Sequence, residues 1–449
     1  MAPFTNSPAF PRAAPESWHN TIMRQETTIS RRHAVLGLSA LAAAASAPVQ
    51  AQTADLVSDG DSDQTAALQA AIDSAVGKLT LPAGRFRVGQ INLKSNFTLE
   101  GVPGATWLVA SGGPALVISN QQSTIVRDIG FTGNSGTDPL FGIETGTDIT
   151  VERCHFTDGS NIALGMHASA VRVRDCVFLN HADCAIHSLE STGSLISGNH
   201  IDGCGNAGIR IWRDTKGVDG SIVTNNRIAN IDWKAGGNGQ NGNGINVYLA
   251  DEVIVSDNHI SDCAFTAVRL NTTKNTVVSG NQCRTCGEVA IFSEFGFSGS
   301  IIAENLIDGA ATGISITNLD SEGHLATCAN NIVRNISPKS EVNPDTVPVG
   351  IYVEAEVSVT GNVVENVPGV AIAAGFGRFM RSIVIANNVV YASDVGIGVT
   401  VADDPGPVLI ADNMIYEPKV GEIVGLEWTK ITEPDLRAAA DKYPHVTIR

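Results

Sequence analysis

A short motif recurs along most of this chain, and its spacing is the feature that most limits the possible folds. In each copy a short apolar run ends at a polar residue, most often asparagine. These residues are Asp128, Arg153, Asp175, Asn199, Asn226, Asn258, Asn281, Asn305, Asn331, Asn362, Asn388 and Asn413. They are separated by 22 to 32 residues. Repeats of this length indicate a solenoid, in which one unit cannot bury its apolar side alone and stacks on its neighbours.

Each repeat has the pattern of β-strands. Two short apolar runs occur per repeat, as in 253–255 and 267–270, and no repeat has the long 3.6-residue periodicity of a helix. Two or three strands per coil, separated by Gly, Asn and Asp turns, predict an all-β fold, a single-stranded right-handed parallel β-helix. Neighbouring coils would lie about 4.8 Å apart, so residues distant in the sequence would form rows along the solenoid.

The repeats predict one elongated domain, because a solenoid grows by adding coils to one continuous core. We expect four segments: an N-terminal extension with an export signal (1–51), an N-terminal cap with irregular first coils (52–124), the β-helix repeats (125–416) and a C-terminal cap (417–449).

Both caps have recognisable patterns. Capping residues over 59–65 precede an Ala-rich segment, 66–76, whose apolar face predicts a helix that closes one end of the solenoid. Strand, turn and strand are expected over 79–86. At the other end, 433–443 predicts a short helix and 445–449 a terminal strand. Such caps protect the open strand edges of the last coils.

The N-terminal extension predicts export. Arg31 and Arg32 precede the apolar run 35–45, which is too short to span a bilayer, and small residues follow at 45–47 and 49–51. The arginine pair resembles a twin-arginine signal, which would engage the twin-arginine export machinery; an ordinary secretory signal is the alternative. We expect a periplasmic or secreted protein. No other stretch reaches the roughly 20 apolar residues of a membrane span.

The net charge of −17 argues against nucleic acid or an anionic membrane as a partner, since few cations are available to neutralise phosphates.

The opening at 59–61, the capping helix and the turn Pro82-Ala83-Gly84 resemble the N-terminal end of pectate-lyase-like β-helix proteins, and the resemblance extends over residues 55–416. With the export signal and the asparagine-marked repeats, the chain also resembles a family of twin-arginine-translocated repeat proteins. That resemblance implies a fold and a compartment but no reaction. The polygalacturonases of this fold carry an adjacent aspartate pair and an Asn-Thr-Asp segment. Neither occurs on the candidate face described below, so glycoside hydrolysis is not expected.

The recurring asparagines and the eight cysteines are expected to be structural. Asparagine tolerates the left-handed backbone of a sharp turn, and stacked amides can bond from coil to coil. Cys154 and Cys176 hold equivalent positions in adjacent repeats, as do Cys263 and Cys286, so each pair is expected to stack as buried thiols. None has the four-ligand spacing of a zinc site.

The second strand of each repeat carries the candidate site. The inward positions align as Ile143, Ala163, Ile186, Ile209, Ile245, Val268, Ile291, Ile314 and Ile351, which directs the following residue outward. The catalytic candidates on this face are His187, Arg210 and Arg269. The candidate substrate-binding residues are Asp183, Trp212, Asn246, Tyr248, Asn271 and Glu294. Two insertions, 234–243 and 338–348, precede the strand and are expected to wall a cleft.

These side chains suit a polysaccharide, because aromatic rings stack on sugars and arginine pairs with uronate carboxylates. A uronate lyase or C5-epimerase needs a base and a cation that stabilises the enolate. His187, or an arginine of lowered pKa, would be the base, and Arg210 or Arg269 would stabilise the charge. Calcium would suit such a site, but the sequence offers no carboxylate cluster as ligands.

The alternative is a non-catalytic carbohydrate-binding or structural protein of the cell envelope, since the solvated face of any sheet is polar. The deciding point is whether His187, Arg210 and Arg269 project outward into one groove. A register shift of one residue would bury them.

Overall fold

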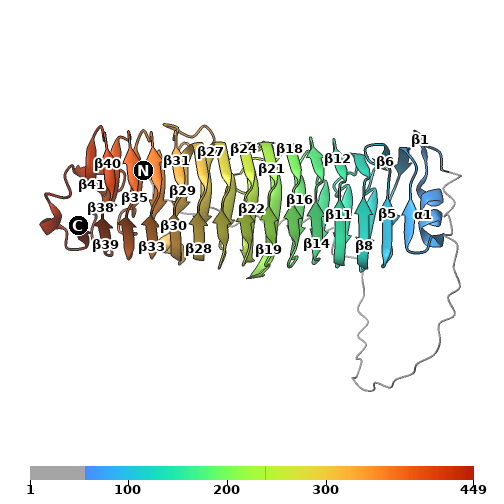
Figure 1. Cartoon of the computed structure of the whole chain (residues 1–449), viewed down its shortest axis with the longest axis horizontal. Helices are drawn as coiled ribbons and strands as arrows, with labels where there is room; N and C mark the ends of the chain where they lie inside the picture. The colour runs from blue at the N-terminus through green and yellow to red at the C-terminus, as the bar shows by residue number, and fades with distance from the viewer. Residues whose placement is uncertain (1–55, 238) are drawn as a thin grey trace, which may run out of the picture. The chain divides into compact units, whose positions relative to one another are not determined.

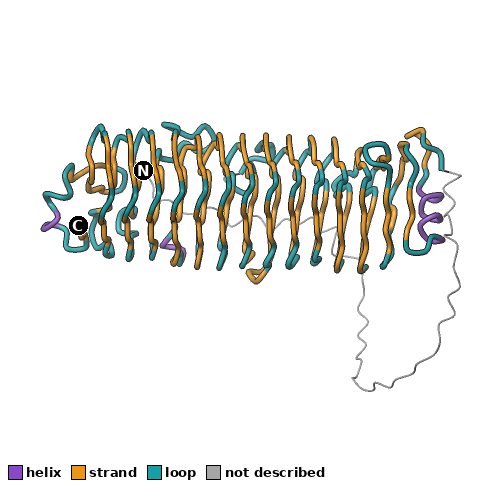
Figure 2. Tube along the Cα trace, in the orientation of Figure 1, coloured by secondary structure: helices purple, strands orange, loops and turns teal. Residues whose placement is uncertain are grey.

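The computed structural model describes residues 56–237 and 239–449, which form a right-handed parallel β-helix, as the repeats predict (Figures 1 and 2). The coils follow one another from β5 near one end to β39 and β41 near the other. The predicted export signal, including Arg31 and Arg32, lies outside the described residues. No helix within the described residues is long and apolar enough to cross a membrane.

A complete coil contains three strands, for example β17 (Leu195–Ser197), β18 (His200–Cys204) and β19 (Ala207–Val218). Equivalent strands of successive coils pair in parallel and build three ladders, which we name ladder 1, ladder 2 and ladder 3 after the order of these three strands.

Ladder 1 is a sheet of its own. Besides β17 it contains β2 (Lys78–Thr80), β5 (Phe97–Glu100), β8 (Gln122–Arg127), β11 (Thr147–Glu152), β14 (Val171–Arg174), β20 (Ile222–Thr224), β23 (Ile254–Ser256), β26 (Val277–Ser279), β28 (Ser298–Ala303), β30 (His324–Ala329), β33 (Val357–Thr360), β36 (Ile383–Ala386), β39 (Val408–Ala411) and β43 (Val446–Ile448).

Ladders 2 and 3 are joined, because β27 (Gln282–Glu294) and β29 (Leu306–Ile316) run through both. Ladder 2 begins with β1 (Asp59–Asp63) and continues through β3 (Gly84–Val88), β6 (Thr106–Ser111), β9 (Gly130–Asn134), β12 (His155–Thr157), β15 (Val177–Leu179), β18, β21 (Arg227–Ile231), β24 (His259–Cys263), β27, β29, β31 (Ile332–Arg334), β34 (Val363–Glu365), β37 (Val389–Tyr391) and β40 (Met414–Tyr416). Ladder 3 contains β4 (Ile91–Asn92), β7 (Leu116–Ser119), β10 (Phe141–Glu144), β13 (Leu164–His167), β16 (Cys184–Leu189), β19, β22 (Asn243–Asp251), β25 (Val268–Asn271), β27, β29, β32 (Val349–Val353), β35 (Val370–Ala374), β38 (Val395–Thr400) and β41 (Gly421–Glu427).

The N-terminal cap forms as predicted. Helix α1 (Thr65–Ser74) buries Leu68, Ala71 and Ile72 against the first coils. Strands β2 and β3 flank the turn at Pro82-Ala83-Gly84. The apolar face of the helix therefore covers core side chains that an open coil would expose to water.

At the C-terminal end the expected helix over 433–443 is wrong, whereas the expected terminal strand is confirmed as β43. The segment contains the end of β42 (Lys430–Glu433) and only a 3-10 turn, Ala440–Lys442. Leu436 is buried and donates its backbone N–H to the carbonyl of Ile423 at 2.9 Å. The segment thus bonds to the last coil through Leu436 and otherwise forms short turns, such as the bond from the N–H of Lys442 to the carbonyl of Ala439, instead of a continuous helix.

The recurring asparagines form a buried row inside the turn between ladders 1 and 2. The Oδ1 of Asn281 accepts the backbone N–H and the Nδ2–H of Asn258, both at 3.0 Å, and each amide from Asn199 to Asn388 is bonded to the next in the same way. Their structural role is confirmed. Such a row satisfies buried backbone groups that the turn would otherwise leave unpaired.

One detail of the asparagine prediction is wrong. The left-handed residue of the turn is the one before the buried amide, such as Asn225 with φ 57°. In the first repeats Asp128, Arg153 and Asp175 are themselves left-handed, so the alignment there is one residue early. The next residue points inward, and Ile129, Cys154 and Cys176 take the place of the buried amide.

The cysteines behave as predicted. Cys176 donates its backbone N–H to Asn199 Oδ1 at 3.0 Å and accepts the N–H of Cys154 on its sulfur at 3.4 Å, which continues the asparagine row. Cys263 and Cys286 are register partners in adjacent coils. All eight cysteines lie in the described part of the chain, buried and unpaired.

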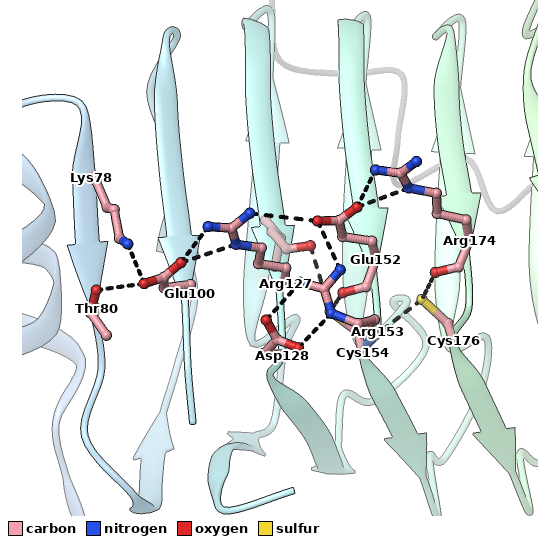
Figure 3. A network of polar contacts seen from close by, with 11 residues as sticks. Lys78, Thr80, Glu100, Arg127, Asp128, Glu152, Arg153, Cys154, Arg174 and Cys176 are labelled. Atoms are coloured by element: carbon pink, nitrogen blue, oxygen red, sulfur yellow. Dashed lines mark hydrogen bonds and ion pairs between the residues drawn. The ribbon is translucent and has the colours of Figure 1, made fainter. Parts of the chain in front are cut away.

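The outer face of ladder 1 begins with charged side chains on neighbouring strands (Figure 3). Arg127 pairs with Glu100 at 2.7 Å and with Glu152 at 3.7 Å, and Arg174 also pairs with Glu152. Opposite charges at intervals of about 4.8 Å support the register of these coils. Beyond β14 this face changes character completely, as described below.

Candidate functional site

The predicted outward row exists on ladder 3 from β16 onward. Ile186, Ile209, Ile245, Val268 and Ile291 are register partners and are buried. The following residues, His187, Arg210, Asn246, Arg269 and Phe292, are therefore partners on the side of the strands opposite the core. A second outward row contains Leu189, Trp212, Tyr248, Asn271 and Glu294.

In the first two repeats the predicted alignment is wrong, by one residue at Ala163 and by two at Ile143. Ile186 pairs with Leu164, not with Ala163, and His187 pairs with Gly165. Leu164 in turn pairs with Phe141, so Ile143 is not its equivalent. Short strands with apolar residues on both sides, such as β13, give no periodicity from which this register could be chosen.

Arg210 is not free to meet a substrate. Its exposed fraction is 6%, and its guanidinium donates to Asp183 through Nη1 at 2.9 Å and through Nη2 at 3.0 Å. Nη2 also donates to Asn241 Oδ1 at 3.1 Å, and Asn206 donates to Asp183 at 3.0 Å. Burial alone would raise the pKa of Asp183, but the charge and hydrogen bonds of Arg210, together with the hydrogen bond from Asn206, lower it. The pair is a compensated internal ion pair.

Arg269 is held in the same manner. It donates through Nε to Glu294 at 2.6 Å and through Nη1 to Glu288 at 3.1 Å, and its exposed fraction is 5%. Asn271 also donates to Glu294, at 2.8 Å. Burial raises the pKa of Glu294 despite the neighbouring guanidinium. Two carboxylates therefore share one cation here.

The first insertion closes over these residues, which corrects the expectation that it walls an open cleft. Gly239 is packed so closely on Arg269 that a Cβ at this glycine would lie 2.3 Å from Nη1. Asn246 is buried and donates to the carbonyl of Gln240 at 3.3 Å. The second insertion reaches the same cluster, where Asn343 donates to Glu288 at 2.8 Å. Arg210, Asn246 and Arg269 thus project outward, but beneath loops.

An aromatic group remains at the surface beside the closed part. His187, Trp212 and Tyr248 are half-buried. The ring centroids of His187 and Trp212 are 5.3 Å apart, and those of Trp212 and Tyr248 are 6.1 Å apart. The Arg210 guanidinium lies 5.0 Å from the Trp212 ring, a cation–π distance that fixes the indole from its inner side. We name His187, Trp212 and Tyr248 the aromatic group.

His187 has two unusual properties. Burial, followed by repulsion from Arg210, lowers its pKa to about 3, so the imidazole is neutral at neutral pH. Its Nε2 atom is buried and has no hydrogen-bond partner among the described residues. Its ring nitrogen has a free lone pair, but a pKa of about 3 makes the imidazole a weak proton acceptor at neutral pH.

The sequence did not single out Glu288, Asn206 or Asn241, which hold the two arginines in place. Asn206 and Asn241 lie outside the strands, and Glu288 lies where the register of β27 shifts between its ladder 2 and ladder 3 parts, so regular strand periodicity does not mark the direction of these side chains. A surface hollow of about 550 Å³ also lies off the predicted row, at the corner between ladders 2 and 3 beside Asp158 and Lys234. Among the described residues no group of three His, Cys, Asp or Glu side chains is placed to hold a metal ion.

Comparisons with known proteins agree with the fold. The family model of the right-handed β-helix region matches residues 167–336 and 215–390. No curated protein matches the sequence.

Several solved structures are similar in backbone. A mutant tailspike protein of the E. coli bacteriophage HK620, in complex with a pentasaccharide, has a TM-score of 0.56 at 12% identity, over 82% of this chain and 77% of that one. An alginate lyase in complex with a trisaccharide has a TM-score of 0.51 at 14% identity, over 88% and 97%. An α-1,3-glucanase from Streptomyces thermodiastaticus has a TM-score of 0.50 at 15% identity, over 78% and 68%. At these identities the similarity establishes the fold alone.

Proposed function

We propose that this protein binds a polysaccharide on the outer face of ladder 3, with the aromatic group as the contact surface. The observation that supports this most is the placement of Trp212 and Tyr248 on adjacent coils, both half-buried and inclined at 68° to each other. Aromatic faces are the surfaces on which sugar rings stack. Because the two rings are not coplanar, we expect one sugar unit to stack on one ring while the next touches the edge of the other.

Two further features support a carbohydrate ligand. Leu189 and Leu249 are half-buried next to the aromatic group and extend its apolar surface. The similar tailspike and alginate lyase structures hold oligosaccharides, which makes this fold a suitable scaffold for such ligands. The export signal predicted at Arg31 and Arg32 would bring the protein to extracellular or envelope glycans.

The charge state of the site favours binding over chemistry. Asp183 neutralises Arg210, and Glu288 with Glu294 neutralises Arg269, so neither guanidinium is available to pair with a uronate carboxylate. An enolate formed on the substrate would lack an uncompensated cation on this row. Ring stacking and hydroxyl contacts remain, and these suit a glycan of low charge density.

Calorimetric titration of the full protein with neutral glucans, alginate, pectate and glycosaminoglycans tests the proposal. Replacing Trp212 with Ala should weaken binding about tenfold, the order of one stacking contact. Trp107→Ala is a matched control. Trp107 lies on the distant strand β6, is also half-buried, and has the guanidinium of Arg85 at 5.7 Å from its ring centroid. Equal affinity of wild type and Trp212→Ala for every bound glycan would refute the proposed surface.

A second candidate function is a uronate lyase or C5-epimerase, and the observation that favours it is the unbonded Nε2 of His187, whose register partner on the next coil is Arg210. In that reaction His187 would take the proton at C5 while Arg210, released in part from Asp183, would stabilise the enolate. A lyase would then break the C4–O bond and pass the proton to the departing oxygen, whereas an epimerase would return a proton to the opposite face of C5. A lyase would produce an unsaturated uronate with a characteristic ultraviolet absorbance, and an epimerase would exchange the C5 proton with deuterated solvent. Loss of either signal in His187→Ala, with glycan binding retained, would establish the catalytic function.

A further inference from the structure

The outer face of ladder 1 contains no charged side chain over nine consecutive described strands, β17 to β39. Its first outward row is aliphatic or hydroxylic: Leu195, Ile222, Ile254, Val277, Ile301, Thr327, Ser358, Val384 and Leu409. Its second outward row is small: Ser197, Thr224, Ser256, Ser279, Ala303, Ala329, Thr360, Ala386 and Ala411. We name these two rows the uncharged face.

This face stands out within its own chain. The same outward positions in the preceding coils hold Glu100, Arg127, Glu152 and Arg174, as Figure 3 shows. Charged residues make up 17% of the sequence and concentrate at surfaces, yet they are absent from both rows of these nine strands. Contiguous uncharged, partly apolar surfaces of this kind mark interaction sites.

The face is open to solvent and is not part of the core. Ile222 is 37% exposed, Ile301 46% and Val384 36%. The residues between the two rows, such as Val278 and Ile302, are fully buried and belong to the core. The solenoid therefore does not need aliphatic side chains in the first outward row for its own packing. Thr327 and Ser358 occupy this row although neither has an aliphatic side chain.

We propose that a second copy of this chain packs against the uncharged face. With a net charge of −17, two copies repel each other wherever carboxylates meet, and this face lets them approach without opposing charges. Acidic residues such as Asp257 and Glu304 occur only at its border, which gives the uncharged centre and polar rim of a protein interface.

The size of the face suits a stable dimer. Nine strands at about 4.8 Å extend roughly 43 Å along the solenoid, and three residues per strand span about 10 Å. The corner residues on both borders about double this width. The contact then covers on the order of 800 Å² per copy, the area of a standard specific interface.

The profile of the two rows also selects an orientation. A two-fold axis parallel to the solenoid axis would place the first outward row of one copy, with its larger side chains, over the small second row of the other. A two-fold axis parallel to the strands would instead set the two first rows against each other. Face-to-face sheets pack about 10 Å apart with interdigitated side chains, which favours the first arrangement. The two solenoids would then run parallel. The contact would use ladder 1, whereas the aromatic group lies on ladder 3 of each copy.

Sedimentation velocity of the full protein over a range of concentrations tests the dimer. We expect a concentration-dependent dimer, and Ile301→Glu should weaken its association on the order of 100-fold, because the two-fold symmetry brings like charges into one uncharged interface. Ile332→Glu is the matched control, since Ile332 is 43% exposed on β31 of ladder 2, in the neighbouring coil. This control should associate like wild type.

A monomeric wild type at all concentrations would overturn the proposal, as would a dimer that Ile301→Glu leaves unchanged while circular dichroism shows a folded chain. Equal weakening by Ile332→Glu would also overturn it, because the contact would then lie elsewhere. Should Ile301→Glu fail to fold, Ser279→Glu on the adjacent strand takes its place with the same expectation, since Ser279 has no apolar surface to lose.

Discussion

Asn281 lies in the middle of the buried asparagine row, and its replacement by alanine tests how much this row contributes to stability. Its Oδ1 accepts the backbone N–H and the Nδ2–H of Asn258. Its own Nδ2 donates to Asn305 Oδ1 and to the carbonyl of Val255, both at 3.0 Å. One side chain thus connects three successive coils.

The expected loss follows from these contacts. After Asn281→Ala the backbone N–H of Asn258 is buried without an acceptor, which costs about 1–3 kcal/mol. The hydrogen bonds with the Nδ2 of Asn258, the Oδ1 of Asn305 and the carbonyl of Val255 contribute about 1 kcal/mol each. The free energy of unfolding should therefore fall by about 4–6 kcal/mol, a large part of the 5–15 kcal/mol that is typical of folded domains.

The chain itself supplies a matched comparison. In the same row Cys176 accepts the N–H of Cys154 on its sulfur and approaches the carbonyl of Val151 at 3.7 Å. Asn281→Cys should restore an acceptor for Asn258 and cost only about half as much as Asn281→Ala. Guanidinium titrations, with reversibility checked by dilution, would measure both losses. A cost of Asn281→Ala below about 1 kcal/mol, or equal costs for the two variants, would refute this account of the row.

Two further predictions concern buried charges. Burial raises the pKa of Glu354 from 4.5 to about 7, although the backbone N–H groups of Asn318 and Leu319 donate to it. As the pH rises, Glu354 ionises in the unfolded chain before it ionises in the folded protein. The free energy of unfolding should therefore fall by about 3 kcal/mol as the pH rises from 4.5 to 7. Denaturant titrations at pH ~5 and ~8 should show most of this loss in wild type and none of it in Glu354→Gln. Arg269→Ala leaves Glu288 and Glu294 buried without their cation and should cost about 3–5 kcal/mol at neutral pH; if Arg269→Ala unfolds at the same denaturant concentration as wild type, the ion cluster has no structural role.

The fold was predictable because its information is local and repeated. Each repeat carries its own inward aliphatic residues and its own turn, and the same pattern recurs often enough to specify the solenoid. The row His187, Arg210, Asn246 and Arg269 followed from the two-residue period of strands. The alignment of the repeats is wrong where the buried residue is not an asparagine. Cys154 and Cys176 occupy that position, so the polar residue that ends the apolar run there is the preceding Arg153 or Asp175.

The character of the candidate site was not predictable in the same way. Strand periodicity states that Arg269 points away from the core but not what lies above it. Gly239 and Asn343, in insertions without periodicity, and Glu288 at a corner decide that Arg269 is enclosed and neutralised. The aromatic group stays half-buried at the surface, whereas Asn271 and Glu294, in the same outward row as Trp212 and Tyr248, are buried, so the position in a row does not decide exposure.

The sequence by itself determined the β-helix, its helical N-terminal cap, the buried asparagine and cysteine rows, and the side of the strand from which each candidate residue projects. Each of these depends on contacts between a residue and its equivalent in the next coil, which the repeat fixes. Only the tertiary structure decided which outward residues meet solvent. That outcome depends on how loops of irregular sequence fold back over ladder 3, and on long-range pairs such as Asp183 with Arg210, whose formation no local pattern encodes.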